Sequence, residues 1–230
     1  MRPKITAVIL AAGRGERAGK GLPKQFVSVL GSPLFIYSVK AFLSAGVVDE
    51  IIVLVPRGWV VYSEKELKRL RGNKPVKVFT GGHRRQDSVY KGLLHISEDM
   101  EYVVIHDAVR PLVTPGLIVR TVEGALTCGA CVPVVMPPDT VKEVGRGVIK
   151  RTIPRERIGL TQTPQAFSCK ILRKVYQKGP PRRPVTDDAQ LIEVIGKRIK
   201  AIPGERMNFK VTWREDFCVL EAHLKRSTRF

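Results

Sequence analysis

Short runs of β-branched and other apolar residues recur along this chain of 230 residues, and stretches with helical spacing of apolar residues separate most of them. Continuous apolar runs are typical of strands buried on both faces of a parallel sheet, with helices packed on either side. The pattern predicts an α/β, Rossmann-like three-layer fold with a mostly parallel sheet. The expected strands are 5–11, 51–56, 76–79, 102–106, 131–135 and 198–202, and the expected helices are 34–45, 86–96, 117–127, 169–177 and 187–195.

The chain is predicted to form a single domain, 1–230, because neither a linker nor an internal repeat divides it. A hydrophobic fraction of 43% is enough for a real core. In open α/β sheets the ligand lies at the carboxyl ends of the strands, and a functional site is expected there.

Residues 139–167 interrupt the alternation of strands and helices. The stretch V-K-E-V-G-R-G-V-I-K, 141–150, alternates apolar and polar residues around G-R-G, which is typical of a hairpin. A long two-stranded excursion buries little surface by itself. We therefore expect 139–167 to be a protruding β-arm that packs against a second copy of the chain and makes a homodimer.

The charge of the chain points to an anionic partner. There are 40 basic and 21 acidic residues and a formal net charge of +19, which suits a nucleic acid, a nucleotide or a phosphorylated metabolite. No apolar run reaches the roughly 18 residues of a membrane span, so no membrane partner is expected. The apolar run near the N-terminus passes directly into a glycine-rich loop and is interpreted as the first strand of a cytoplasmic protein rather than a signal peptide.

Cysteine spacing suggests no metal centre. C-G-A-C at 128–131 has metal or redox spacing, but neither a second pair nor a histidine cluster completes a tetrahedral site.

The glycine-rich segment that follows the first strand reads A-A-G-R-G-E-R-A-G-K-G-L-P-K-Q, 11–25. A dinucleotide fingerprint would need an acidic residue about 20 positions later, and no acid lies between Glu16 and Asp49. The Walker A pattern is absent as well. A loop remains whose backbone N–H groups suit a phosphate chain, with Arg17 and Lys24 to offset charge developing on phosphorus. A solvated basic loop is the alternative for this stretch taken alone.

His106 and Asp107 end an apolar strand where the site is expected. A carboxylate beside bound phosphates is most useful as a Mg²⁺ ligand, directly or through water, and Asn208 could supply a second oxygen. The alternative for Asp107 is a helix cap.

Several further motifs follow in order along the chain. They are G-G-H-R-R-Q-D-S-V (81–89), H-D-A-V-R-P (106–111), D-T-V-K (139–142), R-T-I-P-R (151–155), L-T-Q-T-P-Q-A-F (160–167), V-T-D-D-A (185–189) and N-F-K-V-T (208–212). Together with the first loop, which resembles that of sugar-nucleotide pyrophosphorylases, they make the chain resemble the 2-C-methyl-D-erythritol 4-phosphate cytidylyltransferases over nearly its whole length. This resemblance implies that CTP and 2-C-methyl-D-erythritol 4-phosphate react to give 4-diphosphocytidyl-2-C-methyl-D-erythritol and pyrophosphate, in non-mevalonate isoprenoid synthesis.

The resemblance also implies residue roles. Arg17 and Lys24 would stabilise the transition state at the α-phosphorus of CTP, and Arg155 and Lys210 would hold the methylerythritol phosphate in line. No covalent nucleophile is required, because the substrate phosphate itself attacks. Nucleotide-binding residues would be Ala11, Ala12, Gly13, Gly15, Gly82, His83 and Ser88; His83 stands where some members carry Asp. Substrate contacts would come from Asp107, Arg110, Thr140, Thr163 and Thr186, with Thr140 and Arg155 reaching the partner's site. An ordinary exposed helix serine is the alternative for Ser88.

Two rival functions stay open at this stage. An enzyme that makes CDP-ribitol would share the nucleotide half and differ in the alcohol pocket. A basic nucleic-acid-binding protein is a different class, although the chain carries no aromatic-rich binding motif or nucleic-acid module, so no nucleic-acid partner is expected.

Overall fold

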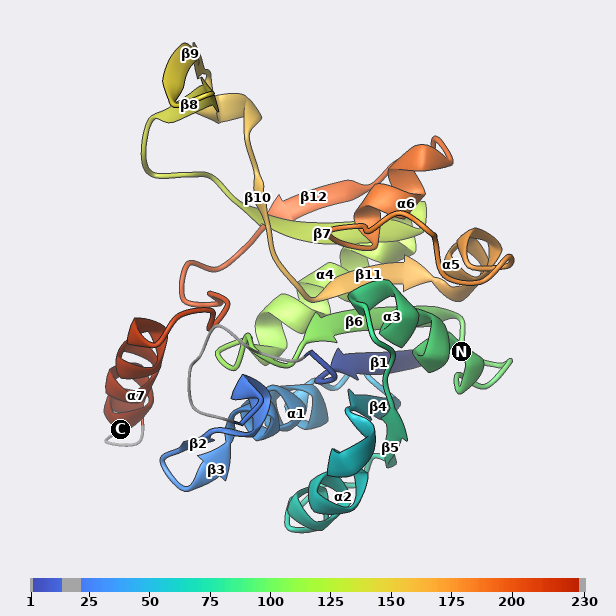
Figure 1. Ribbon diagram of the computed structural model, residues 1–230. Helices are drawn as coiled ribbons and strands as arrows, with labels where there is room; N and C mark the ends of the chain where they lie inside the picture. Colours follow the sequence, from blue (N-terminus) through green and yellow to red (C-terminus); the bar gives the residue numbers. More distant parts are fainter. Residues whose placement is uncertain (1, 14–21, 228–230) are drawn as a thin grey trace.

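The computed structural model describes residues 2–13 and 22–227, so Gly15 and Arg17 lie outside the described residues. One mixed sheet runs through the molecule in the order β10-β7-β11-β6-β1-β4-β5, with β12 added beside β7 (Figure 1). Its strands are β1 Ile5–Leu10, β4 Glu50–Val55, β5 Val76–Thr80, β6 Tyr102–Asp107, β7 Ala130–Val135, β10 Leu160–Thr161, β11 Gln165–Ser168 and β12 Lys200–Pro203. β1, β4, β5 and β6 are parallel, as is the β7–β12 pair. The six strands expected from the sequence are all present, with ends that differ by no more than about two residues.

Helices cover both faces of this sheet. They are α1 Leu34–Ser44, α2 Val60–Lys68, α3 Arg85–Leu94, α4 Pro115–Cys128, α5 Cys169–Val175 and α6 Ala189–Val194, and a further helix, α7 Glu215–Ser227, lies near the C-terminus. The sequence predicted all of these except α2 and α7. Short 3-10 turns occur at η2 Lys24–Phe26, η3 Arg57–Trp59 and η4 Arg155–Arg157, and a small hairpin joins β2 Ser28–Val29 to β3 Ser32–Pro33.

The buried side chains of the strands divide between two cores. Ile51, Val53 and Val55 of β4 pack with α1 and α4, whereas Ile52 and Leu54 of the same strand pack with α3, α5 and α6. Successive side chains of a strand point to opposite faces, so a continuous apolar run fills both cores. The three-layer α/β architecture predicted from the sequence is confirmed.

The predicted hairpin is present as a separate two-stranded sheet, β8 Val141–Gly145 and β9 Val148–Ile153. Arg146 and Gly147 form its turn with φ of 51° and 76°, the left-handed conformation that tight hairpin turns require. In Figure 1 this hairpin stands clear of the main sheet.

The end of the predicted arm is corrected by the structure. β10 and all but the last residue of β11 fall inside the expected excursion 139–167, yet both strands pair antiparallel with the main sheet, and β11 lies between β6 and β7. The backbone groups of β6 and β7 need a partner between them, and β11 supplies it. The protruding part is therefore the hairpin and its two connections, up to η4.

Among the described residues, no helix has both the length and the apolar character needed to cross a bilayer.

Candidate active site

The carboxyl ends of β1 and β6 lie side by side, with Leu10 opposite Asp107 in the parallel register. Beyond β1, Ala11 N donates to Leu54 O (2.8 Å), and Gly81 N donates to Val55 O (2.8 Å). A Cβ on Gly81 would lie 2.3 Å from the Cβ of Ala12. Only glycine permits this close approach, which brings the two segments predicted to bind the nucleotide, 11–13 and 81–88, against each other.

The first turn of α3 shapes the second of these segments. Gly82 N donates to the Ser88 hydroxyl (2.9 Å), and a Cβ on Gly82 would lie 2.3 Å from the Cβ of Asp87. Ser88 is buried and His83 is exposed. Ser88 is therefore not an ordinary exposed helix serine, because its hydroxyl holds the loop on the helix N-terminus.

A continuous chain of charged and polar groups, here called the strand-end cluster, crosses the same edge of the sheet. Lys210 Nζ donates to Asp107 Oδ2 (2.8 Å), and Arg85 Nε donates to Asp107 Oδ1 (3.3 Å). Arg85 Nη1 donates to Asp188 Oδ2 (2.6 Å), and Tyr176 donates its hydroxyl to Asp188 Oδ1 (3.0 Å). Two cations thus share two buried carboxylates between the ends of β6, α3 and α6.

This arrangement fixes the charge state of the cluster. Burial by itself raises the pKa of the Asp107 carboxyl, but Arg85 and then Lys210 outweigh it and hold that pKa well below its usual range. Burial and the neighbouring Asp188 raise the pKa of Tyr176 far above its usual range. At neutral pH Asp107 is a carboxylate and Tyr176 a neutral donor.

A second buried network lies beside Asp107. His106 Nε2 contacts Arg110 O (3.2 Å), and because a carbonyl only accepts, Nε2 carries the proton. Burial lowers the pKa of His106 to about 3, so Nδ1 of the neutral ring accepts from the Thr163 hydroxyl (3.1 Å). Asp107 N donates to the same hydroxyl oxygen (3.0 Å). The Thr163 hydroxyl therefore fixes the backbone at Asp107, and its proton is given to His106 rather than to a ligand.

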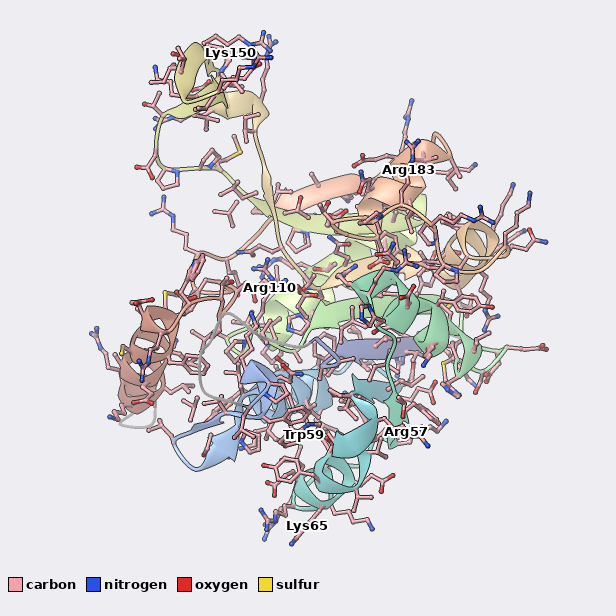
Figure 2. The ribbon with its side chains drawn as sticks, in the orientation of Figure 1. Arg57, Trp59, Lys65, Arg110, Lys150 and Arg183 are labelled. Carbon is pink, nitrogen blue, oxygen red and sulfur yellow. The ribbon has the colours of Figure 1, made fainter. Side chains whose placement is uncertain are left out.

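The residues Asp107, Arg110, Thr163, Thr186 and Lys210, all predicted from the sequence, line one cavity of about 180 Å³. Figure 2 labels Arg110, which lies near the middle of the molecule. Arg110 Nη1 donates to Asn208 O (2.9 Å), and burial lowers the pKa of the Arg110 guanidinium. The other lining residues are Arg85, Thr161, Gln162, Gln165 and Asp187. The cavity combines three cations with two carboxylates, which suits a phosphorylated polyol.

Other predicted residues do not line this cavity. Thr140 and Arg155 are exposed on the arm, where Arg155 Nη1 donates to Pro138 O (2.7 Å). Figure 2 marks the arm by Lys150, away from Arg110. Lys24 is buried in η2 and does not line this cavity.

Three residues that position this site were not singled out from the sequence: Arg85, Asp188 and Gln25. Arg85 and Asp188 stood inside two of the quoted motifs, as the second Arg of H-R-R-Q and the second Asp of V-T-D-D. Gln25 is buried and donates Nε2 to both Ala11 O and Gly13 O (2.7 Å each). A polar residue next to a phosphate-binding loop can be recognised in the sequence as a candidate site residue. The backbone carbonyls that it bonds can be identified only from the structure.

The described residues contain no group of three His, Cys, Asp or Glu side chains placed to hold a metal. Asp107 is an ionised carboxylate at the cavity and fits Mg²⁺, which is commonly bound by one carboxylate together with substrate phosphates and waters. Asn208 Oδ1 lacks a hydrogen-bond partner among the described groups, but the side chain is fully buried and does not line the cavity. The helix-cap alternative for Asp107 finds no support, since its carboxylate bonds Arg85 and Lys210 instead.

Known proteins of one enzyme family match this chain over nearly its whole length. Residues 5–226 match the family model described as 2-C-methyl-D-erythritol 4-phosphate cytidylyltransferase. Enzymes of that name from Pelotomaculum thermopropionicum and Syntrophus aciditrophicus are 39% and 38% identical; the alignments cover 96% and 98% of this chain and 94% and 98% of theirs. The crystal structure of the Thermus thermophilus enzyme of that name has a TM-score of 0.74 at 32% identity, covering 95% of this chain and 98% of its own. The 4-diphosphocytidyl-2C-methyl-D-erythritol synthase of Anaerococcus prevotii has a TM-score of 0.84 at 28% identity, covering 97% and 96%.

Proposed function

The chain belongs to the 2-C-methyl-D-erythritol 4-phosphate cytidylyltransferase family, and from this premise we propose how its residues divide the work. The enzyme transfers the cytidylyl group of CTP to 2-C-methyl-D-erythritol 4-phosphate in isoprenoid synthesis. A phosphate oxygen of the acceptor attacks the α-phosphorus of CTP, a new P–O bond forms, and the bond to the departing pyrophosphate breaks. No covalent intermediate on the protein is needed. The observation that carries the assignment is the cavity at the strand ends, where Lys210, Arg110 and Asp107 meet in a chain of this family.

We propose that CTP binds along the two loops that approach each other at Ala12 and Gly81. Ala11, Ala12, Gly13 and Gly15 contact the phosphates, and Gly82, His83 and Ser88 surround the base. Arg17 and Lys24 stabilise the charge that grows on the α-phosphoryl group and on the leaving pyrophosphate.

The acceptor occupies the cavity beside Lys210. Its phosphate is held by Lys210 and Arg155, and its hydroxyls bond Thr186 and the backbone of Thr163. Holding the phosphate in line with the α-phosphorus is the entropic part of catalysis. Thr140 and Arg155 do not reach this cavity from their own arm, which supports a homodimer in which each arm completes the partner's site.

Mg²⁺ is proposed as the cofactor, with Asp107 as the protein ligand beside the phosphates of CTP. The ion would neutralise part of the triphosphate charge. Asn208 is the proposed second oxygen ligand: its backbone carbonyl accepts from Arg110 and its Nδ2 donates to Thr163 O, so Oδ1 is the atom that the ion would use. We also propose that the enzyme acts in the cytoplasm, where CTP is available.

The first test is pyrophosphate release from each of four nucleoside triphosphates, with methylerythritol phosphate or ribitol 5-phosphate as acceptor and with or without Mg²⁺. Release that requires CTP, methylerythritol phosphate and Mg²⁺ is expected. Preference for ribitol 5-phosphate would move the chain to the CDP-ribitol class.

In the same assay Lys24→Ala should lower turnover ~10²-fold with little change in CTP binding, because Lys24 acts on developing charge. Near-normal turnover would remove Lys24 from the catalytic residues.

The second test mixes Arg155→Ala and Lys24→Ala chains by co-expression. Each homodimer should be nearly inactive, whereas a mixed dimer has one site with both wild-type residues. Since about half of the dimers are mixed and each has one good site of two, roughly a quarter of wild-type activity should return. No recovery despite subunit mixing would mean that Arg155 serves the site of its own chain.

A further inference from the structure

Lys24 stands on a turn that has little structure of its own. η2 contains only Lys24, Gln25 and Phe26, and its backbone bonds are Phe26 N to Pro23 O (2.9 Å) and Val27 N to Lys24 O (3.2 Å). A three-residue turn of this kind does not fix the direction of a side chain by itself. The contacts of the two other side chains in the turn, Gln25 and Phe26, add to what holds it in place.

Gln25 and Phe26 hold the turn from two directions. Gln25 ties it to the end of β1 through its two bonds to Ala11 O and Gly13 O. Phe26 enters a cage of rings: Trp59 stacks on it with centroids 4.0 Å apart and planes 8° apart, while Phe35 and Tyr62 meet it edge-on at 5.6 and 6.0 Å.

Trp59 is the outer wall of this cage. It belongs to η3, which begins just beyond the carboxyl end of β4, and it is only half-buried, whereas Phe26 is buried. Tyr62 supports the indole edge-on from the next turn of the chain, with centroids 5.3 Å apart. Figure 2 labels Trp59 next to α2. Removing the indole would expose the face of the Phe26 ring on which Trp59 stacks.

We propose that Trp59 is a positioning residue for the reaction: by stacking on Phe26 it fixes the turn that carries Lys24. The inference rests on the proposed catalytic role of Lys24. A displacement of about 1 Å at a charge-stabilising group is enough to slow such a reaction considerably. A purely structural role would instead lower the stability of the fold without depending on Lys24.

A double-mutant cycle on turnover separates these two roles. Trp59→Ala should lower kcat about tenfold in the wild-type background, with KM for the acceptor within about twofold. In the Lys24→Ala background the same substitution should change kcat less than about twofold, because the group that it positions is gone. Trp59→Phe, which keeps a stacking ring, should restore most of the turnover. Val61→Ala, a neighbouring position that is 79% exposed, is the control and should leave kcat unchanged.

An equal loss of kcat in both backgrounds, or no loss from Trp59→Ala, would overturn the inference. If Trp59→Ala does not fold, Trp59→Leu keeps apolar volume without the stacked face and enters the same cycle. Failure of the premise is distinguishable, because Lys24→Ala alone would then turn over near the wild-type rate, and failure of the proposed function would appear in the wild-type chain as no release of pyrophosphate from CTP with methylerythritol phosphate.

Discussion

The strand-end cluster and the β-arm carry residues expected to serve the same reaction, yet they are built in opposite ways. In the cluster, Asp107, Arg85 and Asp188 are enclosed by the sheet and helices, and every charge has an opposite charge beside it. On the arm, Val144, Val148 and Ile149 are more than 60% exposed, and the ion pair Arg151–Glu143 (2.6 Å) faces solvent. The cluster is complete within one chain, whereas the arm presents apolar surface that one chain leaves uncovered.

This difference predicts where substitutions act. A change in the cluster leaves a buried charge without a partner, which costs free energy within the chain. A change of an apolar residue on the arm removes little stability from the isolated chain and shows its effect on association.

The largest effect on stability is expected from Asp188→Ala. It leaves the buried Arg85 with one carboxylate partner and Tyr176 without its acceptor, so the free energy of unfolding should fall by about 3–5 kcal/mol in urea denaturation. The matched control is Asp99→Ala, which breaks an ion pair with Lys4 of 2.6 Å in which both side chains are more than half exposed. The control should lose far less stability, because solvent screens an exposed pair. Similar losses in the two variants would remove the contrast between buried and exposed pairs.

The titration of His106 is expected to have a smaller effect on the free energy of unfolding. The unfolded chain protonates this histidine near pH 6.5, whereas burial holds its folded pKa at about 3. The unfolded state therefore takes up the proton first, and stability falls as the pH drops from 6.5 towards 3. Between pH 6.5 and 5 this amounts to about 2 kcal/mol, and His106→Gln should abolish that part of the pH dependence in unfolding experiments. An unchanged slope in the variant would place its source elsewhere.

The smallest effect on the single chain is expected on the arm. Ile149→Thr should change the free energy of unfolding by less than about 0.5 kcal/mol at concentrations where the chain is monomeric. The same variant should weaken self-association in sedimentation velocity, because the exposed apolar face of the hairpin is the surface proposed to pack on a second copy. Val61→Thr removes an exposed apolar side chain of α2 and should leave association unaffected. Unchanged association of the Ile149→Thr variant would contradict dimerisation through this face.

Much of the fold was predictable because its signals are local. The sequences of β1, β4 and β6 are continuous runs rich in β-branched residues, and G-R-G at 145–147 predicts the hairpin turn. β11 was missed because Q-A-F-S has no such run, and its place between β6 and β7 depends on strands far away in the sequence. α2 was missed because few of its side chains are buried, which leaves a weak apolar pattern.

The site divides in the same way. Asp107 was predicted from its place at a strand end, and Arg110 and Lys210 from the family resemblance; the fold brings the three to one cavity although Asp107 and Lys210 are 103 positions apart. The Thr163 hydroxyl was expected to contact substrate, but its proton goes to His106, since the tautomer is set by a carbonyl that the sequence does not place.

By itself the sequence determined which chemistry the chain carries: a glycine-rich loop with cations, a carboxylate at a strand end, and a hairpin with apolar faces. Only the tertiary structure decided which of these groups meet, which charges neutralise one another and which ring holds the Lys24 turn. The physical reason is the range of the forces involved. Backbone conformation and burial periodicity act between near neighbours in sequence, whereas ion pairs such as Asp107–Lys210 and stacks such as Phe26–Trp59 act across space between segments that the sheet brings together.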